Sequence, residues 1–562
     1  MAAMPTSPDN KARGAYYTPP LVAQALVDWA VVSPGRVLDP ACGDGAFLTA
    51  ALGRFARVGG GGEVFGVELD AAALGSAKDA VEARIAADAR LGLNAAVPVG
   101  HLLQRDFLDV SASDIGSFDA VVGNPPFVRF QRLTRSQRAV AGERAAAAGV
   151  TLDPLASYWA PFLIHASTFL QPGGRLALVL PAELGHARYA KSILAFLAGR
   201  FRRVRLVAFE QPLFPHLDQH TLLLLAEGHG RPGRSFALAK VKSATELTSG
   251  LESLDYQALD TEGLTRGSVK LHHAWLEPEA AEMLSWLRTS RSVSRLGHHA
   301  RVMIGYVTGA NDYFHFDPER ALELGIGASQ LRRAVFRSRA LDGTAFTDAD
   351  WFSATESGDA GVLFSPTDES DPAVSAYLQV GIEAGVDATA KARHRTPWYR
   401  VTRTAPPDLL LTAMSAVGPR LSVNDAQVAV CNTLHGVWRR SGSGAAAATT
   451  LAAAALSSLT ELSAELEGHA LGGGLLKLEP SAAQALLLPL PAAPTGEVDP
   501  VQWRALERLV RRGDRAGARA AADAAYLVSI PGVGEKGAQV LATAAETLRA
   551  LRRGLRSGDA SS

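Results

Sequence analysis

The sequence has 562 residues, more than one compact domain usually contains, so two or three domains are expected. Hydrophobic residues make up 47% and charged residues 20%, a balance typical of a folded globular protein and not of a disordered one. The apolar runs are too short to cross a bilayer, and the N-terminal residues lack the apolar core of a secretion signal. Two cysteines exclude a disulfide framework and a cysteine-ligated zinc site. We therefore expect a cytoplasmic protein without membrane segments or bound metal.

The charges balance overall, because the sequence has 56 basic and 56 acidic residues. Net charge therefore gives no support to nucleic-acid binding, but two local segments do. Arginines recur at every third position in one of them, at Arg129, Arg132, Arg135 and Arg138. The other, residues 391–403, carries five Lys or Arg residues and no acid. A basic groove backed by acidic outer surfaces is compatible with this distribution.

The first part of the chain alternates short apolar runs with helical stretches, a pattern typical of an α/β protein with a mostly parallel sheet. Thr18, a hydroxyl residue before Pro19 and Pro20, is the expected N-cap of the first helix. The expected helices are 19–30, 71–88, 158–170 and 189–198. The expected strands are 35–38, 64–68, 118–122, 175–180, 204–209 and 221–225.

The regularity fades after about residue 230. The following segment is mixed in character, and residues 442–456 are low in complexity, so that a helix and a flexible join both remain open there. The stretch 500–556 is rich in Ala, Arg and Leu and predicts helices. We expect three domains, at residues 1–235, 236–495 and 496–562.

The first chemical motif is VLDPACGDGAFL, Val37 to Leu48, in which a strand ends at Asp39 and a helix begins near Ala46. Glycines at 43 and 45 leave room for a ligand that lies against the backbone, since a Cβ there would block it. A nucleotide-like cofactor suits such a crevice. A dinucleotide site is disfavoured, because Leu48 stands where the GxGxxG pattern needs its third glycine. An ordinary strand–helix turn remains the alternative.

Two acids follow at the ends of later strands. Glu68, with Asp70 as a second choice, ends the second strand and can accept hydrogen bonds from both hydroxyls of a ribose. Asp106 comes after an expected third strand, where its carboxylate can accept a hydrogen bond from an adenine amino group while the ring of Phe107 packs against the base. Acids at strand ends are often simply solvated, and Asp106 taken alone is better explained as a surface loop residue.

The decisive motif is GNPPF, Gly123 to Phe127, directly after the apolar strand FDAVV. Two prolines fix two φ angles and remove two N–H donors, so the loop is stiff. The amide oxygen of Asn124 and the carbonyl of Pro125 can therefore accept both hydrogens of one amino group. This frees the nitrogen lone pair of an aryl amine for in-line attack on a sulfonium methyl group, and the flat ring of Phe127 can stack on the base. A rigid turn without chemistry is the alternative for Asn-Pro-Pro alone.

Together these motifs resemble the gamma-class adenine-N6 DNA methyltransferases of restriction–modification systems, in their type II and type IIG-like branch. GAYYTPP (14–20) is similar to the motif beside the methionine end of the cofactor, DPACGDGAF to the first cofactor motif, and VELD, RDF and GNPPF to the following motifs. The resemblance implies a Rossmann-like sheet of seven mostly parallel strands and S-adenosylmethionine as cofactor. It implies Asn124, Pro125, Pro126 and Phe127 as catalytic residues. The implied cofactor-binding residues are Tyr17, Thr18, Pro19, Asp39, Ala41, Cys42, Gly43, Gly45, Phe47, Glu68, Asp106 and Phe107.

In this family the catalytic motif begins with Asn or Asp, and tyrosine is commoner than phenylalanine at its last position. The motif order implies a methyltransferase domain at 1–235, a target recognition domain at 236–495 and a helical tail. Segments 303–314, 395–401, 432–437 and 472–480 resemble that recognition domain. The expected partners are double-stranded DNA and a separately encoded restriction endonuclease. The protein is expected to act as a monomer that flips adenine out of the duplex. The expected DNA-binding residues are Arg129, Arg132, Arg393, Arg395, Trp398 and Arg400.

Four alternatives remain to be weighed. Asn-Pro-Pro-aromatic also serves enzymes that methylate RNA bases or protein glutamine, although the large C-terminal region argues against both. A fused nuclease is disfavoured because only 13 residues precede Gly14 and no nuclease motif is visible. A catalytically silent DNA-binding subunit is disfavoured by the intact motifs. The segment 529–541 resembles a helix-hairpin-helix, but a plain interhelical loop explains it equally well.

Overall fold

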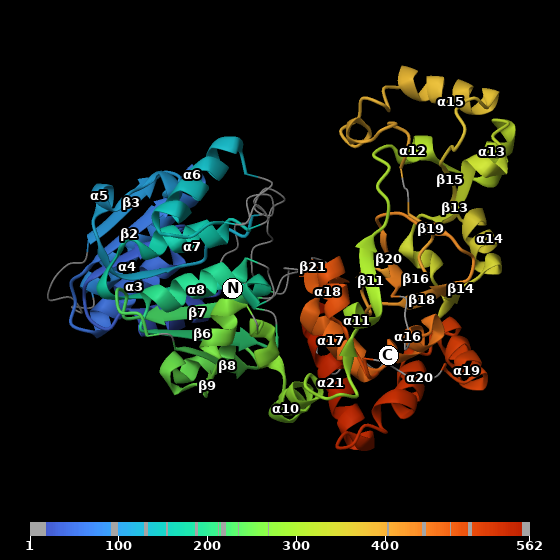
Figure 1. The fold of residues 1–562 in the computed structure, drawn as a ribbon. Coiled ribbons are helices and arrows are strands. Elements are labelled where there is room, and N and C mark those ends of the chain that lie inside the picture. Colours follow the sequence, from blue (N-terminus) through green and yellow to red (C-terminus); the bar gives the residue numbers. More distant parts are fainter. Residues whose placement is uncertain are drawn as a thin grey trace. The chain divides into compact units, whose positions relative to one another are not determined.

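The computed structural model describes residues 18–90, 99–128, 133–152, 156–185, 189–211, 213–214, 221–233, 235–267, 269–401, 404–440, 446–471, 474–492 and 497–553. The chain divides into two compact units, Met1–Ala274 and Trp275–Ser562. The division expected at residue 235 therefore lies further along the chain, and the C-terminal helices fold within the second unit. The elements carry the labels of Figure 1.

The first unit is built on a nine-stranded sheet with the order β3-β2-β1-β4-β5-β7-β6-β8-β9. Neighbours from β3 to β5 are parallel, β7 runs antiparallel to both β5 and β6, and β8 is parallel to β6. The strands are β1 (Arg36–Asp39), β2 (Glu63–Glu68), β3 (Val99–Gln104), β4 (Phe118–Gly123), β5 (Leu170–Pro181), β6 (Arg203–Phe209), β7 (Thr221–Glu227), β8 (Phe236–Val241) and β9 (Gln257–Ala258).

Helices cover both faces of this sheet. One buried cluster joins the helices before β1, after β1 and after β2 to alternate strand residues such as Val37, Ala120 and Val179. The intervening residues Val121 and Leu178 are also fully buried, so the opposite face is covered as well. The helices are α2 (Pro20–Ala30), α3 (Ala46–Arg57), α4 (Ala71–Arg90), α5 (Ala112–Ile115), α6 (Arg135–Ala147), α7 (Trp159–Ser167), α8 (Ala190–Arg200) and α9 (Thr261–Arg266).

The α/β prediction is confirmed, and each expected strand and helix of this unit is present. The sheet is larger than expected, however, because β8 and β9 add two strands beyond the predicted seven. Val204 of β6 pairs with Phe236 of β8, in the segment assigned from sequence to the recognition domain. The domain boundary at 235 is wrong for this reason.

The second unit contains four smaller sheets, with the orders β11-β20-β16-β18-β14, β12-β15-β13-β19, β17-β22-β21 and β10-β23. Several strands have only two residues. Their bounds are β10 (Ser294–Arg295), β11 (Ala300–Ile304), β12 (His315–Phe316), β13 (Leu331–Val335), β14 (Ala345–Phe346), β15 (Ala360–Phe364), β16 (Leu409–Thr412), β17 (Met414–Ser415), β18 (Leu421–Asn424), β19 (Ala429–Val430), β20 (Leu434–Arg439), β21 (His469–Leu471), β22 (Leu475–Lys477) and β23 (Leu487–Leu488).

Helices of the second unit lie between these strands and at the C-terminal end. The described part of the low-complexity segment 442–456 contains a helix, α16, and helices occupy most of residues 500–553, as expected. The bounds are α10 (Pro278–Leu287), α11 (Leu296–His299), α12 (Asn311–Phe314), α13 (Pro318–Glu323), α14 (Asp348–Glu356), α15 (Pro372–Glu383), α16 (Ala448–Ala454), α17 (Ser458–Glu467), α18 (Pro480–Ala485), α19 (Pro500–Arg511), α20 (Arg515–Ala522) and α21 (Gly534–Arg553).

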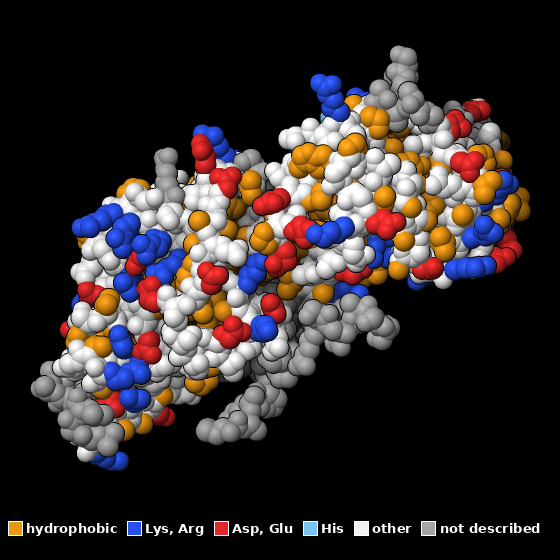
Figure 2. Space-filling view, turned by 90° about the horizontal axis from the view of Figure 1, so that it is seen from below, with side chains coloured by type: hydrophobic (Ala, Val, Ile, Leu, Met, Phe, Trp, Pro, Cys, Tyr) orange, Lys and Arg blue, Asp and Glu red, His pale blue; other side chains and the backbone are white. Residues whose placement is uncertain are grey.

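The surface carries mixed charges. On the face drawn in Figure 2, Lys and Arg side chains lie among Asp and Glu side chains, as the zero net charge leads one to expect. Within the described ranges, every helix is too short or too polar to cross a membrane.

Candidate active site

The predicted motifs meet at one edge of the sheet because their strands are parallel neighbours. Leu38 in β1 pairs with Val121 in β4, so Asp39 and Gly123 end adjacent strands. A Cβ on Gly123 would lie 2.7 Å from Oδ1 of Asp39, closer than real contacts allow. Glycine at 123 therefore lets the start of the Asn-Pro-Pro loop approach the end of β1.

Asp39 is fully buried at this edge. Its Oδ1 accepts a hydrogen bond from the backbone N–H of Ala41 at 3.1 Å. Its Oδ2 has no hydrogen-bond partner among the described residues. Burial, reinforced by the nearby carboxylates of Glu68 and Asp44, raises the pKa of Asp39 well above its usual range. The Oδ2 atom of Asp39 is therefore a buried polar atom that a polar group of a ligand would satisfy.

The two glycines in the turn between β1 and α3 have different roles, which the sequence interpretation did not distinguish. Gly43 and Gly45 both have left-handed backbones, with φ of 54° and 87°. A Cβ on Gly43 would meet no described atom within 4 Å, so space for a ligand lies open there. A Cβ on Gly45 would instead lie 3.2–3.4 Å from Ala77 of α4. The expectation that Gly45 makes room for a ligand is therefore wrong, since it makes room for a helix.

The side chain of Glu68 organises the same turn. Its Oε2 accepts from the N–H of Gly43 at 2.9 Å, and its Oε1 accepts from Leu69 and Asp70 at 2.8 and 2.9 Å. The carboxylate thus ties the end of β2 to the glycine turn after β1. Glu68 is only half-buried, so part of its surface stays accessible.

The catalytic loop leaves β4 at Asn124. The Asn124 side-chain Nδ2 donates to the hydroxyl Oγ1 of Thr18 at 3.3 Å. Pro125 is buried, and the ring of Phe127 is half-buried against the apolar core. Beyond the motif, the N–H of Tyr158 donates to the carbonyl of Val128 at 2.8 Å. The loop is thus held at its beginning and at its end.

Thr18 does not play the part expected from sequence. The N-cap of α2 is Pro19, and no side chain caps this helix end in the described structure. The N-cap prediction for Thr18 is wrong, because its buried hydroxyl accepts the hydrogen bond from Asn124 instead.

Asp106 and Phe107 follow β3, as predicted. Oδ1 of Asp106 accepts from the N–H of Leu108 at 3.1 Å and from the hydroxyl of Tyr158 at 3.2 Å. The ring of Phe107, however, is 3% exposed and packs against Phe162, His165 and Phe169. This packing leaves little of the ring surface accessible, and a contact between the ring and adenine stays a prediction. Phe107 anchors the short turn that presents Asp106.

Other predicted cofactor residues also support the site from within. Cys42 and Phe47 are 4% and 3% exposed, so their side chains belong to the core and are not available as ligand contacts. Burial raises the pKa of the Cys42 thiol far above its usual value, which keeps it neutral. Ala41 and Pro19 are half-buried at the edge of the site. Tyr17, Arg129 and Arg132 lie outside the described residues.

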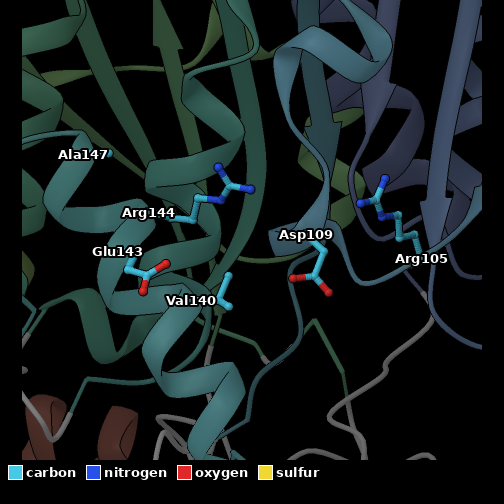
Figure 3. A pocket seen from close by; sticks show the side chains of 6 residues that line it. All are labelled: Arg105, Asp109, Val140, Glu143, Arg144 and Ala147. Carbon is cyan, nitrogen blue, oxygen red and sulfur yellow. The ribbon is translucent and has the colours of Figure 1, made fainter.

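A pocket of about 520 Å³ lies between the segment that follows β3 and helix α6. Figure 3 shows Glu143 and Arg144 on α6, with Arg105 and Asp109 on the opposite side. Two basic and two acidic side chains balance within it. Its described lining contains none of the predicted cofactor or catalytic residues.

The basic segment of the second unit separates into exposed and internal residues. Arg393 and Arg400 are exposed. Arg395 is half-buried, and its guanidinium donates to the carbonyls of Val307 and Thr308, at 2.9 Å for the latter. The DNA-contact prediction for Arg395 is therefore corrected to a structural role. Trp398 is half-buried beside Tyr313, with ring centroids 5.8 Å apart.

Comparisons with known proteins agree with the motifs. A profile of the N-6 DNA methylase family matches residues 3–186, and a profile described as the C-terminal domain of the type II methyltransferase M.Eco57I matches residues 268–527. The chain is 25% identical to the type II methyltransferase M.XamI of Xanthomonas campestris pv. amaranthicola over 85% of each chain. It is 22% identical to M.AccI of Acinetobacter calcoaceticus, over 75% of this chain and 74% of that one.

A solved structure of the type IIG restriction endonuclease BpuSI aligns with 97% of this chain, at 16% identity and a TM-score of 0.41. The chain spans 65% of the length of that protein. The N-6 DNA methylase family uses S-adenosylmethionine and acts on DNA, which agrees with the cofactor motifs and disfavours RNA or protein as substrate. The chain belongs to the N6-adenine DNA methyltransferases of type II restriction–modification systems, in the branch that resembles M.Eco57I.

Proposed function

We propose that this protein methylates the N6 amine of an adenine that it has rotated out of double-stranded DNA, and so protects host DNA from a separately encoded endonuclease. The observation that carries the proposal is the meeting of Asn124 with the glycine turn and Glu68 at adjacent strand ends. An amine-binding group and a nucleoside-binding crevice therefore share one edge of the sheet.

S-adenosylmethionine supplies an electrophilic methyl group on its sulfonium sulfur. Three features fit such a ligand. The space at Gly43 is open, Glu68 lies at the tip of β2, and the buried Oδ2 of Asp39 has no partner among the described residues. Within the described residues the hydrogen bonds of Asp106 from Leu108 and Tyr158 go to Oδ1, and we assign its Oδ2 to an adenine amine. These residues would hold the cofactor, together with Pro19, Tyr17 and the backbone of Ala41 and Cys42.

The chain's own part in the reaction is to orient the target amine. The Oδ1 of Asn124 and the carbonyl of Pro125 accept its two hydrogens, so that the nitrogen lone pair turns away from the purine ring. Bound S-adenosylmethionine would supply the methyl carbon for in-line attack by this nitrogen, with the sulfonium sulfur as leaving group. The nitrogen afterwards releases one proton to solvent. Stacking on Phe127 offsets the cost of extruding the base, at about 1–3 kcal/mol.

In this proposal the second unit binds DNA and selects the target sequence. Its match to the C-terminal domain of a type II methyltransferase covers Arg393, Trp398 and Arg400. The two exposed arginines suit phosphate contacts, which position a protein on DNA without reading its sequence. Arg129 and Arg132 follow the catalytic loop directly in the chain and are assigned the same role.

Substitution of Asn124 tests the proposed chemistry. Asn124→Ala removes the side-chain acceptor and should slow single-turnover methyl transfer at least about a hundredfold, the range seen when a preorganised transition-state hydrogen bond is lost. The affinities for S-adenosylmethionine and DNA should stay the same. Asn124→Asp is the matched control, because it keeps an acceptor of the same shape and should retain measurable activity.

Transfer is best measured with tritiated S-adenosylmethionine, and the product located by modification-sensitive sequencing of a host that lacks adenine methylation. Full activity of Asn124→Ala would refute the assignment of the catalytic loop. A methyl group found on cytosine would refute adenine as target.

A further inference from the structure

We propose that Thr18 is a positioning residue that fixes the orientation of the Asn124 amide for methyl transfer. The inference rests on the proposed function of Asn124, and it assigns to Thr18 a role other than the cofactor contact implied by family resemblance. It comes from one contact across 106 positions of the chain, the hydrogen bond from Nδ2 of Asn124 to Oγ1 of Thr18 at 3.3 Å.

The threonine is buried beside the start of a core helix. It is 7% exposed and lies two residues before α2, whose residues Val22, Leu26 and Val27 are fully buried. The helix end does not use the hydroxyl, because the N-cap is Pro19 and the first turn forms through the carbonyl of Pro19 to the N–H of Val22. The hydroxyl thus remains directed at the catalytic loop.

The orientation of an amide matters because its two ends differ. Nδ2 is a donor and Oδ1 is an acceptor, and a rotation of 180° about the last side-chain bond exchanges them. Methyl transfer needs the acceptor toward the substrate amine. A hydroxyl that accepts from Nδ2 selects the rotamer in which the oxygen points elsewhere.

The backbone contacts of the loop do not set this rotation. Gly123 lies against Asp39 at the start, and Tyr158 binds the carbonyl of Val128 at the end. Pro125 and Pro126 stiffen the chain between these points. The last torsion of Asn124 is not set by any of these backbone contacts, and Thr18 acts on that torsion.

The test uses the full chain with Thr18→Val, which has nearly the same shape but no hydroxyl, and Thr18→Ser, which keeps it. Thr18→Val should lower the single-turnover rate at saturating S-adenosylmethionine and DNA about tenfold, the size expected for one hydrogen bond. The affinity for S-adenosylmethionine, measured by calorimetry, should not change. Thr18→Ser should restore most of the rate.

A double-mutant cycle isolates the contact. An aspartate at position 124 has two equivalent oxygens and no orientation to select, even if the Thr18 hydroxyl donates to it, so Thr18→Val should have a much smaller effect in the Asn124→Asp protein. An equal tenfold loss in both backgrounds would overturn the inference, as would a serine variant as slow as valine. Weaker cofactor binding with an unchanged saturated rate would return Thr18 to the cofactor site. If Asn124→Ala abolishes transfer while Thr18→Val does not slow it, only the inference fails; if Asn124→Ala stays active, the proposed function fails.

Discussion

The Glu68 carboxylate accepts hydrogen bonds from three backbone N–H groups, those of Gly43, Leu69 and Asp70. A carboxylate offers about four acceptor positions, so two on Oε1 are filled and one on Oε2 remains. Glu68 therefore shapes the turn and can still bind one hydroxyl, not the two that its sequence position suggested. Its effect on cofactor binding is both direct and through Gly43.

This double role makes Glu68→Gln costly for the cofactor. An amide in place of the carboxylate turns an N–H group toward backbone donors and removes charge-assisted hydrogen bonds. We expect the Kd for S-adenosylmethionine to rise at least about tenfold, corresponding to about 1.4 kcal/mol, with little effect on non-specific DNA affinity. Titration calorimetry and a filter-binding assay measure the two quantities.

Glu63 provides the control for this experiment. It begins the same strand, pairs with Arg36 at 2.9 Å and is 42% exposed. Glu63→Gln should leave cofactor affinity unchanged, because the residue lies at the opposite end of β2. A loss of DNA affinity with intact cofactor binding in Glu68→Gln would show that the acid was misassigned.

Some residues of the site could be placed from the sequence, and others could not. Asp39, Glu68 and Asn124 were predictable at one edge because each ends a strand of a parallel sheet. The hydrogen-bond partner of Asn124 was not predictable, because Thr18 is distant in sequence and its position before two prolines is typical of an N-cap. The burial of Phe107 was not predictable either, because it depends on packing against Phe162 and Phe169 of a later segment.

At the scale of elements, the first unit was predictable where apolar runs are continuous. The strands β2 and β6 and the helix α4 match their predicted ranges to within two residues. The strand β8 was missed, although its pattern is apolar, because its parallel pairing with β6 is a non-local fact. In the second unit, two-residue strands such as β14 and β19 carry too little sequence pattern to be recognised.

The C-terminal helices are part of the second unit, and buried ion pairs connect them to α17. Glu461 of α17, 6% exposed, contacts Arg515 at 2.7 Å, Arg519 at 3.5 Å and Arg549 at 2.9 Å. Burial alone would raise the pKa of Glu461, but the arginines outweigh it and lower the pKa. The separate tail expected at 496–562 is therefore part of this unit.

Glu461→Gln should destabilise this unit strongly. The substitution leaves three arginines without their shared carboxylate, and breaking a buried ion pair typically costs about 3–5 kcal/mol. Chemical denaturation followed by tryptophan fluorescence measures the loss, and Trp286, Trp503 and other tryptophans of the unit report it. Glu546→Gln is the control: Glu546 pairs with Arg519 at 2.6 Å but is 45% exposed, so the loss should stay below about 1 kcal/mol. Equal losses in both variants would contradict the burial argument.

For the whole molecule, zero net charge means that DNA binding must come from where the charges lie. Long-range attraction by the protein as a whole is weak, and affinity should depend on local contacts with phosphates. The exposed arginines 393 and 400 differ in this respect from Arg395, which is held by the carbonyls of Val307 and Thr308. One short basic segment therefore contains both kinds of arginine.

Salt dependence separates the two kinds. If Arg393 and Arg400 each neutralise a phosphate, alanine at either position should reduce the slope of log K against log salt by about 0.9 and weaken binding on all sequences alike. Arg333→Ala serves as control, since Arg333 is exposed but pairs with Asp348 at 2.5 Å. Arg395→Ala should lower the Tm and leave the slope unchanged, because its guanidinium binds the protein and not DNA. An unchanged slope in Arg393→Ala and Arg400→Ala would place the phosphate contacts elsewhere in the chain.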